Sequence, residues 1–425
     1  MIRKHWRLML LCIGGTAMLA LIAANFDRGE KHLRQDLSHT YGVDDPQFQR
    51  AMSVLLGPNI VGGNRFTALQ NGDEIFPSML EAIRGAKHSI DFETYIYWSG
   101  KVGDDFAEAL AERARAGVQV NVLLDWVGSN KMKKEELKKM GDAGVEVRKF
   151  HPLRWYHLDR VNHRTHRKLL VVDGHIGFTG GVGIGDEWGG HAQDPEHWRD
   201  SHYRVEGPVV GQMQAVFDDN WIKSTGKVLH EERFFPAPEN AGDGQAQMFA
   251  SSASGGNQSM ELMYLLAINA AEHSIYLSSA YFIPDDLSAR ALKAAVGRGV
   301  DVELITPGDH TDERTVRYAS RHDWGELIDA GVKIYEYQPT MFHCKMMIVD
   351  GRFVSVGSTN FDARSFTLND EANLNIYDAA FASAQTKVFM DDRAHATEMT
   401  KGKWRERPWY EKLLGAVASW FGPAL

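Results

Sequence analysis

The sequence has few cysteines and no excess of positive charge. Cys12 and Cys344 are its two cysteines in 425 residues; one lies in an apolar run and the other between polar motif residues, so we expect no intrachain disulfide. The 47 basic residues against 56 acidic ones give a formal net charge of −9. This balance argues against broad, sequence-independent binding to nucleic acid, although one local cationic pocket is compatible with it. We therefore expect no nucleic acid partner.

Long apolar runs are also scarce, and the one near the N-terminus extends from Leu8 to Ala24 without a charge. As a helix, these residues would span roughly 26 Å, slightly less than a bilayer core. Three basic residues precede the run, as in a signal peptide, but no A-x-A cleavage pattern ends it. We predict an uncleaved single anchor over residues 1–27, in the cell (inner) membrane. Basic residues flank the run on both sides and leave its orientation open.

A metal-binding cluster is missing as well. Four histidines gather in one region of the first half of the chain, but no close carboxylate–histidine spacing accompanies them. They are His163, His166, His197 and His202. The sequence predicts no metal and no other cofactor.

The chain does contain an internal repeat. Residues 86–93 (AKHSIDFE) match residues 271–278 (AEHSIYLS), and residues 143–147 (AGVEV) match residues 330–334 (AGVKI). Each copy reads as strand, helix, strand, helix, strand, strand, which predicts an α/β fold with a mostly buried sheet flanked by helices. The fold class we expect is therefore two tandem repeats that form a pseudo-twofold body in a single chain.

The expected boundaries follow from this repeat. We place a linker or docking arm at residues 28–62 and the first repeat at residues 63–240. The second repeat spans residues 241–400, and an amphipathic segment at residues 401–425 ends the chain. That last segment fits either a membrane interface or a helix packed on the body.

Each repeat carries one copy of the pattern H-x-K-x4-D. Alternate side chains of an extended strand share a face, so the histidine and lysine point the same way, roughly 7 Å apart. A lysine supplies charge for a tetrahedral anion, and an imidazole can attack phosphorus or pass protons. One copy would mean little, but two copies with identical spacing predict a phosphate site. The six candidate catalytic residues are His166, Lys168, Asp173, His343, Lys345 and Asp350.

The two aspartates of the motif differ from the other candidates. Asp173 and Asp350 lie an odd number of residues after their histidines, which puts them on the opposite face of an extended strand. Although they belong to the motif, we interpret them as structural residues that make turn or interface hydrogen bonds.

The loops that follow the motifs are unequal. The second copy has Ser358 and Asn360, which could donate to a phosphate together with Lys168 and Lys345. The first copy has Gly181 and Gly183 at the corresponding positions and lacks both side-chain donors. Glycine amides can still approach a phosphate, and the glycine run could widen the pocket.

The two motifs, together with the run GSTNFDARSF over residues 357–366, resemble the phospholipase D superfamily and, within it, the bacterial cardiolipin synthases. The resemblance implies a phosphatidyltransferase that condenses two phosphatidylglycerol molecules into cardiolipin and glycerol through a phosphohistidine. It implies a membrane partner, a nucleophilic His166 and an acid–base role for His343. It also implies that an acid just downstream of each motif orients that motif's histidine.

The residues that fit this orienting role are Glu371 and, in the first half, Asp200. The resemblance also favours positions facing the site for Tyr95 and Tyr281, and a membrane-interface role for the C-terminal segment. The main alternative is a phospholipase D that hydrolyses or transesterifies other phospholipids with the same residues. A nuclease of the same superfamily and a non-catalytic scaffold are less consistent with the acidity and with two intact motifs.

Overall fold

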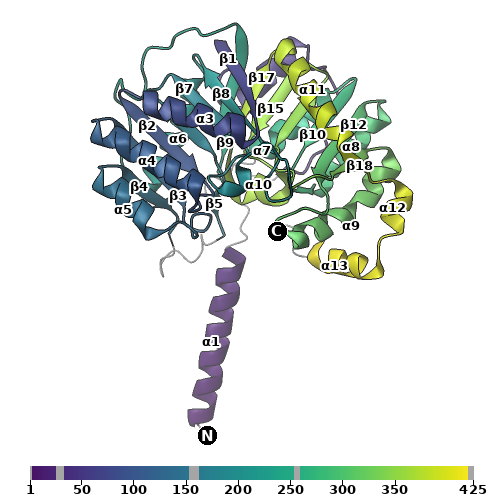
Figure 1. Ribbon diagram of the computed structural model, residues 1–425. Helices are drawn as coiled ribbons and strands as arrows, with labels where there is room; N and C mark the ends of the chain where they lie inside the picture. Colours follow the sequence, from purple (N-terminus) through teal and green to yellow (C-terminus); the bar gives the residue numbers. More distant parts are fainter. Residues whose placement is uncertain (1, 25–32, 153–161, 253–258, 420–425) are drawn as a thin grey trace.

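The computed structural model describes residues 2–24, 33–152, 162–252 and 259–419, and within the first helix it describes the side chains of Trp6 and residues 9–20. Two lobes lie side by side in Figure 1, the first half of the chain in blue and the second in green. The two lobes are not separate sheets, because their strands join at the centre of the body into one continuous sheet.

The sheet repeats the same strand order in both halves. Among the described residues it has sixteen strands, and from the centre outward the first half runs β1-β8-β7-β6-β2-β3-β4 while the second runs β9-β17-β15-β14-β10-β12-β13, with β18 at its outer edge. The strands β2, β3 and β4 of the first half are parallel to one another, as are β10, β12 and β13 of the second half. The strands nearer the centre, such as β6 with β7 and β14 with β15, pair antiparallel. This mirrored order confirms the two repeats that the sequence predicts.

The strands of the first half are β1 (Val61–Gln70), β2 (Ser89–Thr94), β3 (Gln119–Asp125), β4 (Glu146–Phe150), β5 (Arg164–Thr165), β6 (Leu169–Val172), β7 (Ile176–Gly180) and β8 (Ser201–Glu206). Those of the second half are β9 (Gly244–Ser251), β10 (Ser274–Ser278), β12 (Asp301–Pro307), β13 (Lys333–Tyr337), β14 (Met346–Val349), β15 (Phe353–Gly357), β17 (Asn369–Tyr377) and β18 (Ala396–Glu398). A separate two-stranded ribbon joins β11 (Phe282–Ile283) to β16 (Phe361–Asp362).

Helices cover the faces of the sheet. In the first half they are α3 (Asn71–Gly85), α4 (Lys101–Arg115), α5 (Lys134–Asp142), the short 3-10 helix η2 (Asp186–Trp188) and α6 (Val210–Thr225). In the second half they are α7 (Ser259–Ala270), α8 (Asp286–Gly297), α9 (Arg314–Ala330), α10 (Ala363–Thr367), α11 (Ala379–Ala394), α12 (Lys401–Arg405) and α13 (Trp409–Ser419).

The hydrophobic core crosses the boundary between the repeats. One cluster of buried side chains joins Val171 and Trp221 of the first half to Ile348 and Leu374 of the second. The motif strands β6 and β14 are buried along their whole length, as the apolar sequence on both faces predicts for central strands. The two halves therefore share one core, which keeps their motifs in a constant relation.

The segment predicted as a linker or docking arm is docked where the structure describes it. It contains α2 (Pro46–Leu56), which Asp45 caps by accepting a hydrogen bond from an amide of its first turn. Phe48, Met52 and Leu56 lie in the core cluster of the second half.

The N-terminal helix α1 (Ile2–Ala24) stands apart from the body in Figure 1. The transmembrane segment predicted over residues 8–24 is not confirmed: among the described residues, no helix is long and apolar enough to cross a membrane. Residues 25–27 of the predicted anchor lie outside the described residues.

The C-terminal helix α13 shows one packed face and one exposed face. Gly415 and Ala418 are buried, and Gly415 lies so close to α9 that an added Cβ would stand 2.7 Å from the carbonyl oxygen of Tyr318. Glu411 accepts a hydrogen bond of 3.0 Å from Arg321. Of the two readings of this segment, packing on the body is confirmed for the inner face. Residues 420–425 lie outside the described residues.

Candidate active site

Both motifs begin where the chain of one half is hydrogen-bonded to the other half. The amide of His166 donates to the carbonyl of Asp370 over 2.9 Å, and the amide of His343 donates to the carbonyl of Arg199 over 2.7 Å. Next to these contacts, β5 pairs with β17 and Phe342 forms a bridge with Arg199. The two H-x-K segments therefore meet at the interface between the repeats.

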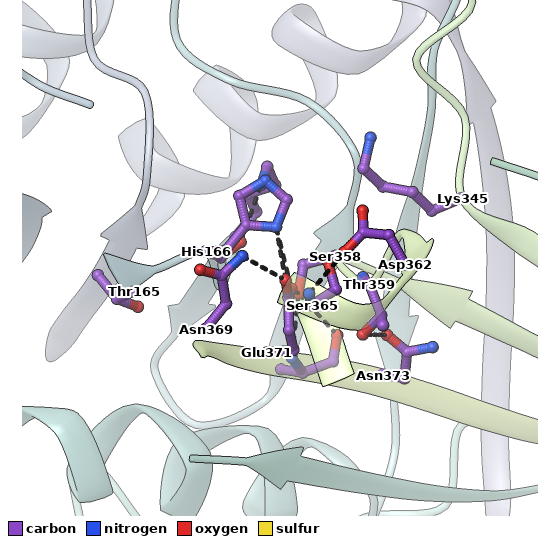
Figure 2. A network of polar contacts seen from close by, with 12 residues as sticks. Thr165, His166, Lys345, Ser358, Thr359, Asp362, Ser365, Asn369, Glu371 and Asn373 are labelled. Atoms are coloured by element: carbon purple, nitrogen blue, oxygen red, sulfur yellow. Dashed lines mark hydrogen bonds and ion pairs between the residues drawn. The ribbon is translucent and has the colours of Figure 1, made fainter. Parts of the chain in front are cut away.

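His166 is held by a carboxylate of the second half. Its Nδ1 lies 2.9 and 3.0 Å from the two carboxylate oxygens of Glu371, as Figure 2 shows. Glu371 also accepts a hydrogen bond of 2.5 Å from the hydroxyl of Ser358 and one of 3.3 Å from the side-chain amide of Asn369. With Nδ1 bonded to the carboxylate, Nε2 is the ring nitrogen left for chemistry.

His343 is held in the same way by a carboxylate of the first half. Its Nδ1 lies 2.8 Å from Oδ2 of Asp200. Asp200 accepts further hydrogen bonds from the indole N–H of Trp188 over 2.9 Å and from the amide of Ser201 over 2.8 Å. Asp200 and Glu371 occupy equivalent places just before or within β8 and β17, which confirms them as counterparts in the repeat.

The pairing of acids and histidines corrects the expectation from the sequence. The resemblance implies that the acid downstream of each motif orients the histidine of its own half. In the structure the acids are exchanged: Glu371 binds His166, and Asp200 binds His343. The physical reason is that each acid begins a strand at the central interface, where its nearest imidazole comes from the other repeat. Among the described contacts, neither motif histidine is bound to a carboxylate of its own half.

The two motif lysines complete the polar cluster. Lys168 Nζ donates to the carbonyl of His166 over 2.8 Å, and Lys345 Nζ donates to the carbonyl of His343 over 2.6 Å. Figure 2 places Lys345 across from His166. All four motif residues, His166, Lys168, His343 and Lys345, are at least 92% buried.

The electrostatics show that the two motifs share one site. The pKa of His166 is lowered to about 4, chiefly by burial; Glu371 opposes this shift, and the ammonium groups of Lys168 and Lys345 add to it. Burial and Lys345 together lower the pKa of His343 to about 3. Lys168 lies close enough to contribute to this lowering as well. The imidazoles are therefore neutral near pH 7 in the unliganded site.

The carboxylates remain ionised, and the pKa values of both lysines are lowered. Burial alone would raise the pKa of Glu371, but His166, Lys168 and the Ser358 hydroxyl outweigh burial and lower it. The pKa of Asp200 is lowered in the same way by His343 and Lys345. Burial, followed by repulsion from Lys345, lowers the pKa of Lys168 to about 7. A bound phosphate anion would restore the charge of this lysine.

In the loop after the second motif, Ser358 has a different contact from the predicted one. Ser358 donates its hydroxyl to Glu371, so in this structure it supports the carboxylate and does not point a donor at a phosphate. Asn360 is 3% exposed, and its Oδ1 has no hydrogen-bond partner among the described residues. A role in binding phosphate therefore stays a prediction for Asn360.

The glycines of the first loop make room for side chains and do not widen a pocket. A Cβ at Gly181 would lie 2.2 Å from an oxygen of Asp200, and a Cβ at Gly183 would lie 2.9 Å from Ile96. The amide of Gly181 donates to the carbonyl of Ser201, which removes it as a phosphate donor. The missing serine is replaced by Trp188, whose indole supplies the second donor to Asp200. The sequence could have indicated a residue such as Trp188, because glycine at position 181, where the second copy has Ser358, removes one hydrogen-bond donor to the buried acid.

The motif aspartates have the structural role that strand alternation predicts. Asp173 accepts hydrogen bonds of 2.7–2.9 Å from the amides of residues 87–89, and Asp350 accepts bonds of 2.7–2.8 Å from those of residues 272–274. Both stand in a turn with a left-handed φ, 53° and 52°. Their oxygens are bound to backbone at the opposite end of the motif strand, and a catalytic role for them stays a prediction.

Aromatic side chains surround the cluster unevenly. The ring of Tyr95 lies 5.2 Å from His166, and the ammonium of Lys168 lies 5.7 Å from the Tyr95 ring. Trp188 and Trp198 pack on His343 at 5.4 and 5.6 Å. Tyr281 donates a hydrogen bond of 2.7 Å to Asp312. The predicted position of Tyr95 beside the site is confirmed. Among the described residues, no three His, Cys, Asp or Glu side chains are arranged to hold a metal ion.

Comparison with known proteins gives a consistent family. The family described as "Cardiolipin synthase, PLD-like domain" matches residues 79–220 and 264–393. The chain is 37% identical over 360 residues to cardiolipin synthase 2 of Bacillus anthracis, covering 84% of this chain and 70% of that protein. It is 36% identical over 400 residues to cardiolipin synthase of Halalkalibacterium halodurans, covering 93% and 79%. The crystal structure of phosphatidylserine synthase from Haemophilus influenzae shares the fold, with a TM-score of 0.64, 14% identity and coverage of 88% and 97%.

Proposed function

Because the chain belongs to the cardiolipin synthase family of phospholipase D-like proteins, we propose that it condenses two molecules of phosphatidylglycerol into cardiolipin and releases glycerol. The observation that carries this proposal is the pair of neutral imidazoles, each fixed at Nδ1 by a carboxylate of the opposite repeat, with two lysines beside them. Such a pair suits a double displacement at a phosphodiester, which needs a nucleophile and a separate acid–base group.

In the first step, Nε2 of His166 attacks the phosphorus of one phosphatidylglycerol. His343 takes up a proton when the phosphate anion binds beside it. A P–N bond then forms, the P–O bond to the head-group glycerol breaks, and His343 gives that proton to the departing alkoxide. Lys168 and Lys345 offset the charge on the non-bridging oxygens. Glu371 and Asp200 keep each ring in the tautomer that presents Nε2 to the phosphorus.

In the second step, a hydroxyl of the second phosphatidylglycerol gives its proton to His343 and attacks the phosphohistidine. The new P–O bond completes cardiolipin, the P–N bond breaks, and His166 returns to its starting form. Hydrolysis by water would follow the same path and yield phosphatidic acid. No step in this scheme assigns a task to Asp173 or Asp350.

We also infer that the protein works at a membrane surface. The described apolar side chains of α1 are exposed, among them Met18 at 65% and Leu19 at 68%. The outer face of α13 exposes Trp409 at 75% and Leu413 at 56%. In Figure 1, α1 and α13 lie toward the same end of the body as β5 and α10, which flank the active site. Exposed aromatic and aliphatic side chains of this kind favour a lipid interface, where the substrate is also found.

The test is turnover of phosphatidylglycerol by the detergent-solubilised full-length protein. Cardiolipin and glycerol in equal amounts are the expected products, and His166→Ala and His343→Ala should each lower turnover by about a thousandfold or more, since each removes a whole step. A trapped phosphopeptide should contain His166. Phosphatidic acid as the sole product would instead favour a hydrolytic phospholipase D. Cleavage of single-stranded DNA without any lipid product would contradict a lipid enzyme altogether.

A further inference from the structure

Cardiolipin synthesis brings two phosphodiesters into one site, and the cluster around the histidines accounts for one of them. Each phosphatidylglycerol carries a single negative phosphate, and a three-carbon glycerol joins the two phosphates in the product. A second anion near the first is costly in a buried site unless cations lie beside it. Further positive side chains should therefore lie within a glycerol's reach of His166 and His343.

Arg164 meets this requirement from the first repeat. In an extended segment, Arg164 shares a face with His166 and Lys168. Residues two apart in such a segment are roughly 7 Å apart, which is about the distance that a glycerol bridge spans between two phosphates. Arg167, on the opposite face, points away and donates to the carbonyl of Val216, in agreement with this alternation. The guanidinium of Arg164 lies 5.8 Å from the ring of Trp126.

Arg364 brings a second guanidinium to the same place from the second repeat. It follows Asp362, which caps α10 by accepting a hydrogen bond from the amide of Ser365. Its Nη2 donates to the carbonyl and the side-chain oxygen of Asn162, at 3.2 and 3.0 Å, across the boundary between the halves. Arg364 thus reaches the segment immediately before Arg164.

The two guanidiniums and Tyr95 form one group at the mouth of the site. Burial, and then repulsion from Arg164, lowers the pKa of Arg364, so the two charges lie close together. Both arginines also act on the hydroxyl of Tyr95, whose ring packs against His166. All three residues are half-buried, whereas the motif histidines and lysines are buried, so the three lie nearer the surface than the reacting groups. Two like charges held together in this way suit a bidentate oxyanion.

The corresponding positions of the other motif carry no such charge. Two residues before His343 the chain has Met341, which is buried in an apolar cluster, and the residue that corresponds to Arg364 in the first loop is Glu187. The site is therefore symmetric at the reacting phosphorus and asymmetric at its mouth. This difference matches a reaction in which the two lipids have different parts, because one donates the phosphatidyl group and the other accepts it.

We propose that Arg164 and Arg364 bind the phosphodiester of the second phosphatidylglycerol, the acceptor, and so favour transfer to a lipid over transfer to water. The proposal rests on the function proposed above. The pair takes no part in bond breaking: the acceptor hydroxyl still loses its proton to an imidazole as the P–N bond breaks. Its contribution is to hold the acceptor phosphate while the free end of the glycerol reaches the phosphohistidine.

The experiment separates the two half-reactions in full-length, detergent-solubilised protein. Exchange of labelled glycerol into phosphatidylglycerol needs the phosphohistidine but no second lipid, whereas cardiolipin formation needs both. Arg164→Gln and Arg364→Gln should each raise the KM for acceptor phosphatidylglycerol about tenfold to a hundredfold, the usual effect of losing a charged hydrogen bond. Glycerol exchange should stay within about twofold, and Arg→Lys at either position should restore part of the loss.

Arg233→Gln is the matched control, because Arg233 pairs with Glu231 on the surface away from the site and its loss changes the net charge equally. An equal fall of exchange and cardiolipin formation in the arginine variants would overturn the proposal, as would no change in either. A wild-type protein that exchanges glycerol without making cardiolipin would overturn the proposed function itself. Thermal unfolding of each variant identifies any loss caused by misfolding, and the Arg→Lys variants then decide the question.

Discussion

At the scale of single residues, the two histidine–carboxylate pairs use different supporting donors. Ser358 donates a hydroxyl to Glu371, while Trp188 donates its indole N–H to Asp200. Asp200 is one methylene shorter than Glu371, and a side chain at Gly181 would collide with it. In both halves the buried carboxylate therefore accepts hydrogen bonds from three donors, but different residues supply these donors.

The variant Trp188→Phe should test this support. It keeps the aromatic contact with His343 but removes one of the donors to buried Asp200, so the pKa of Asp200 should rise and the ring should lose orientation. We expect kcat to fall about tenfold with little change in KM, and the acidic limb of the kcat profile to move to higher pH. Steady-state kinetics across pH measure both. Trp198→Phe is the control, since Trp198 packs on His343 but makes no bond to Asp200 among the described contacts; an equal effect there would contradict the role of the indole.

The lowered pKa of Lys168 predicts how activity depends on pH. In the free site its pKa lies at about 7, because of burial and then Lys345. A phosphate anion stabilises the ammonium, so binding is strongest where the lysine is already protonated and weakens as pH rises above that value. We expect kcat/KM for glycerol exchange to fall by about tenfold per pH unit at alkaline pH. In Lys168→Arg the guanidinium stays charged, and the fall should be absent or displaced upward. A flat wild-type profile up to about pH 9 would contradict this assignment.

At the scale of elements, α13 divides its two faces between the protein and its surroundings. Gly415 and Ala418 face α9, while Trp409, Leu413 and Val417 recur at helical spacing on the outside. The exposed face is the part of α13 that a lipid surface would bury.

Substitution of the outer face should weaken membrane binding without unfolding the protein. We expect Trp409→Glu combined with Leu413→Glu to lower binding to anionic vesicles by about tenfold or more, since each change removes an apolar side chain and adds a repelling charge. The midpoint of thermal unfolding should change little, because both side chains are mostly exposed. Vesicle sedimentation is the measurement. Val54→Glu on α2, 79% exposed, is the control; if it weakens binding equally, the effect belongs to net charge and not to α13.

At the scale of the whole molecule, the two repeats behave as one unit. They share a sheet, a core and both histidine–carboxylate pairs. Arg199, next to Asp200, adds a buried bidentate bond to Asp392 of α11, with distances of 2.7 and 2.8 Å. Shifting one half against the other would break these contacts and the active site together.

The variant Asp392→Ala should therefore destabilise the whole protein. It leaves the guanidinium of Arg199 buried without its carboxylate, which typically costs about 3–5 kcal/mol. We expect one cooperative unfolding transition at lower denaturant concentration, followed by both far-UV and aromatic signals. Asp391→Ala, on the exposed side of the same helix turn, should change the free energy of unfolding by less than about 0.5 kcal/mol. Two separate transitions, one for each half, would contradict the shared core.

Local pattern in the sequence was sufficient for the repeat, for the succession of strands and helices along each unit and for the faces of the motif strands. Strand alternation placed His166 with Lys168 and turned Asp173 away, because side chains two apart share a face in any extended chain. The choice of Glu371 and Asp200 as the orienting acids came from the resemblance to the phospholipase D superfamily.

Tertiary structure alone decided which acid serves which histidine. His166 and Glu371 are 205 residues apart, and their contact depends on the way β5 meets β17 across the boundary between the repeats. The functions of Ser358, Trp188 and Gly181 depend on the same packing, since a hydroxyl or indole can donate to whatever acceptor the fold brings near. Local periodicity determines the direction of a side chain, whereas its partner is determined by how distant strands pair.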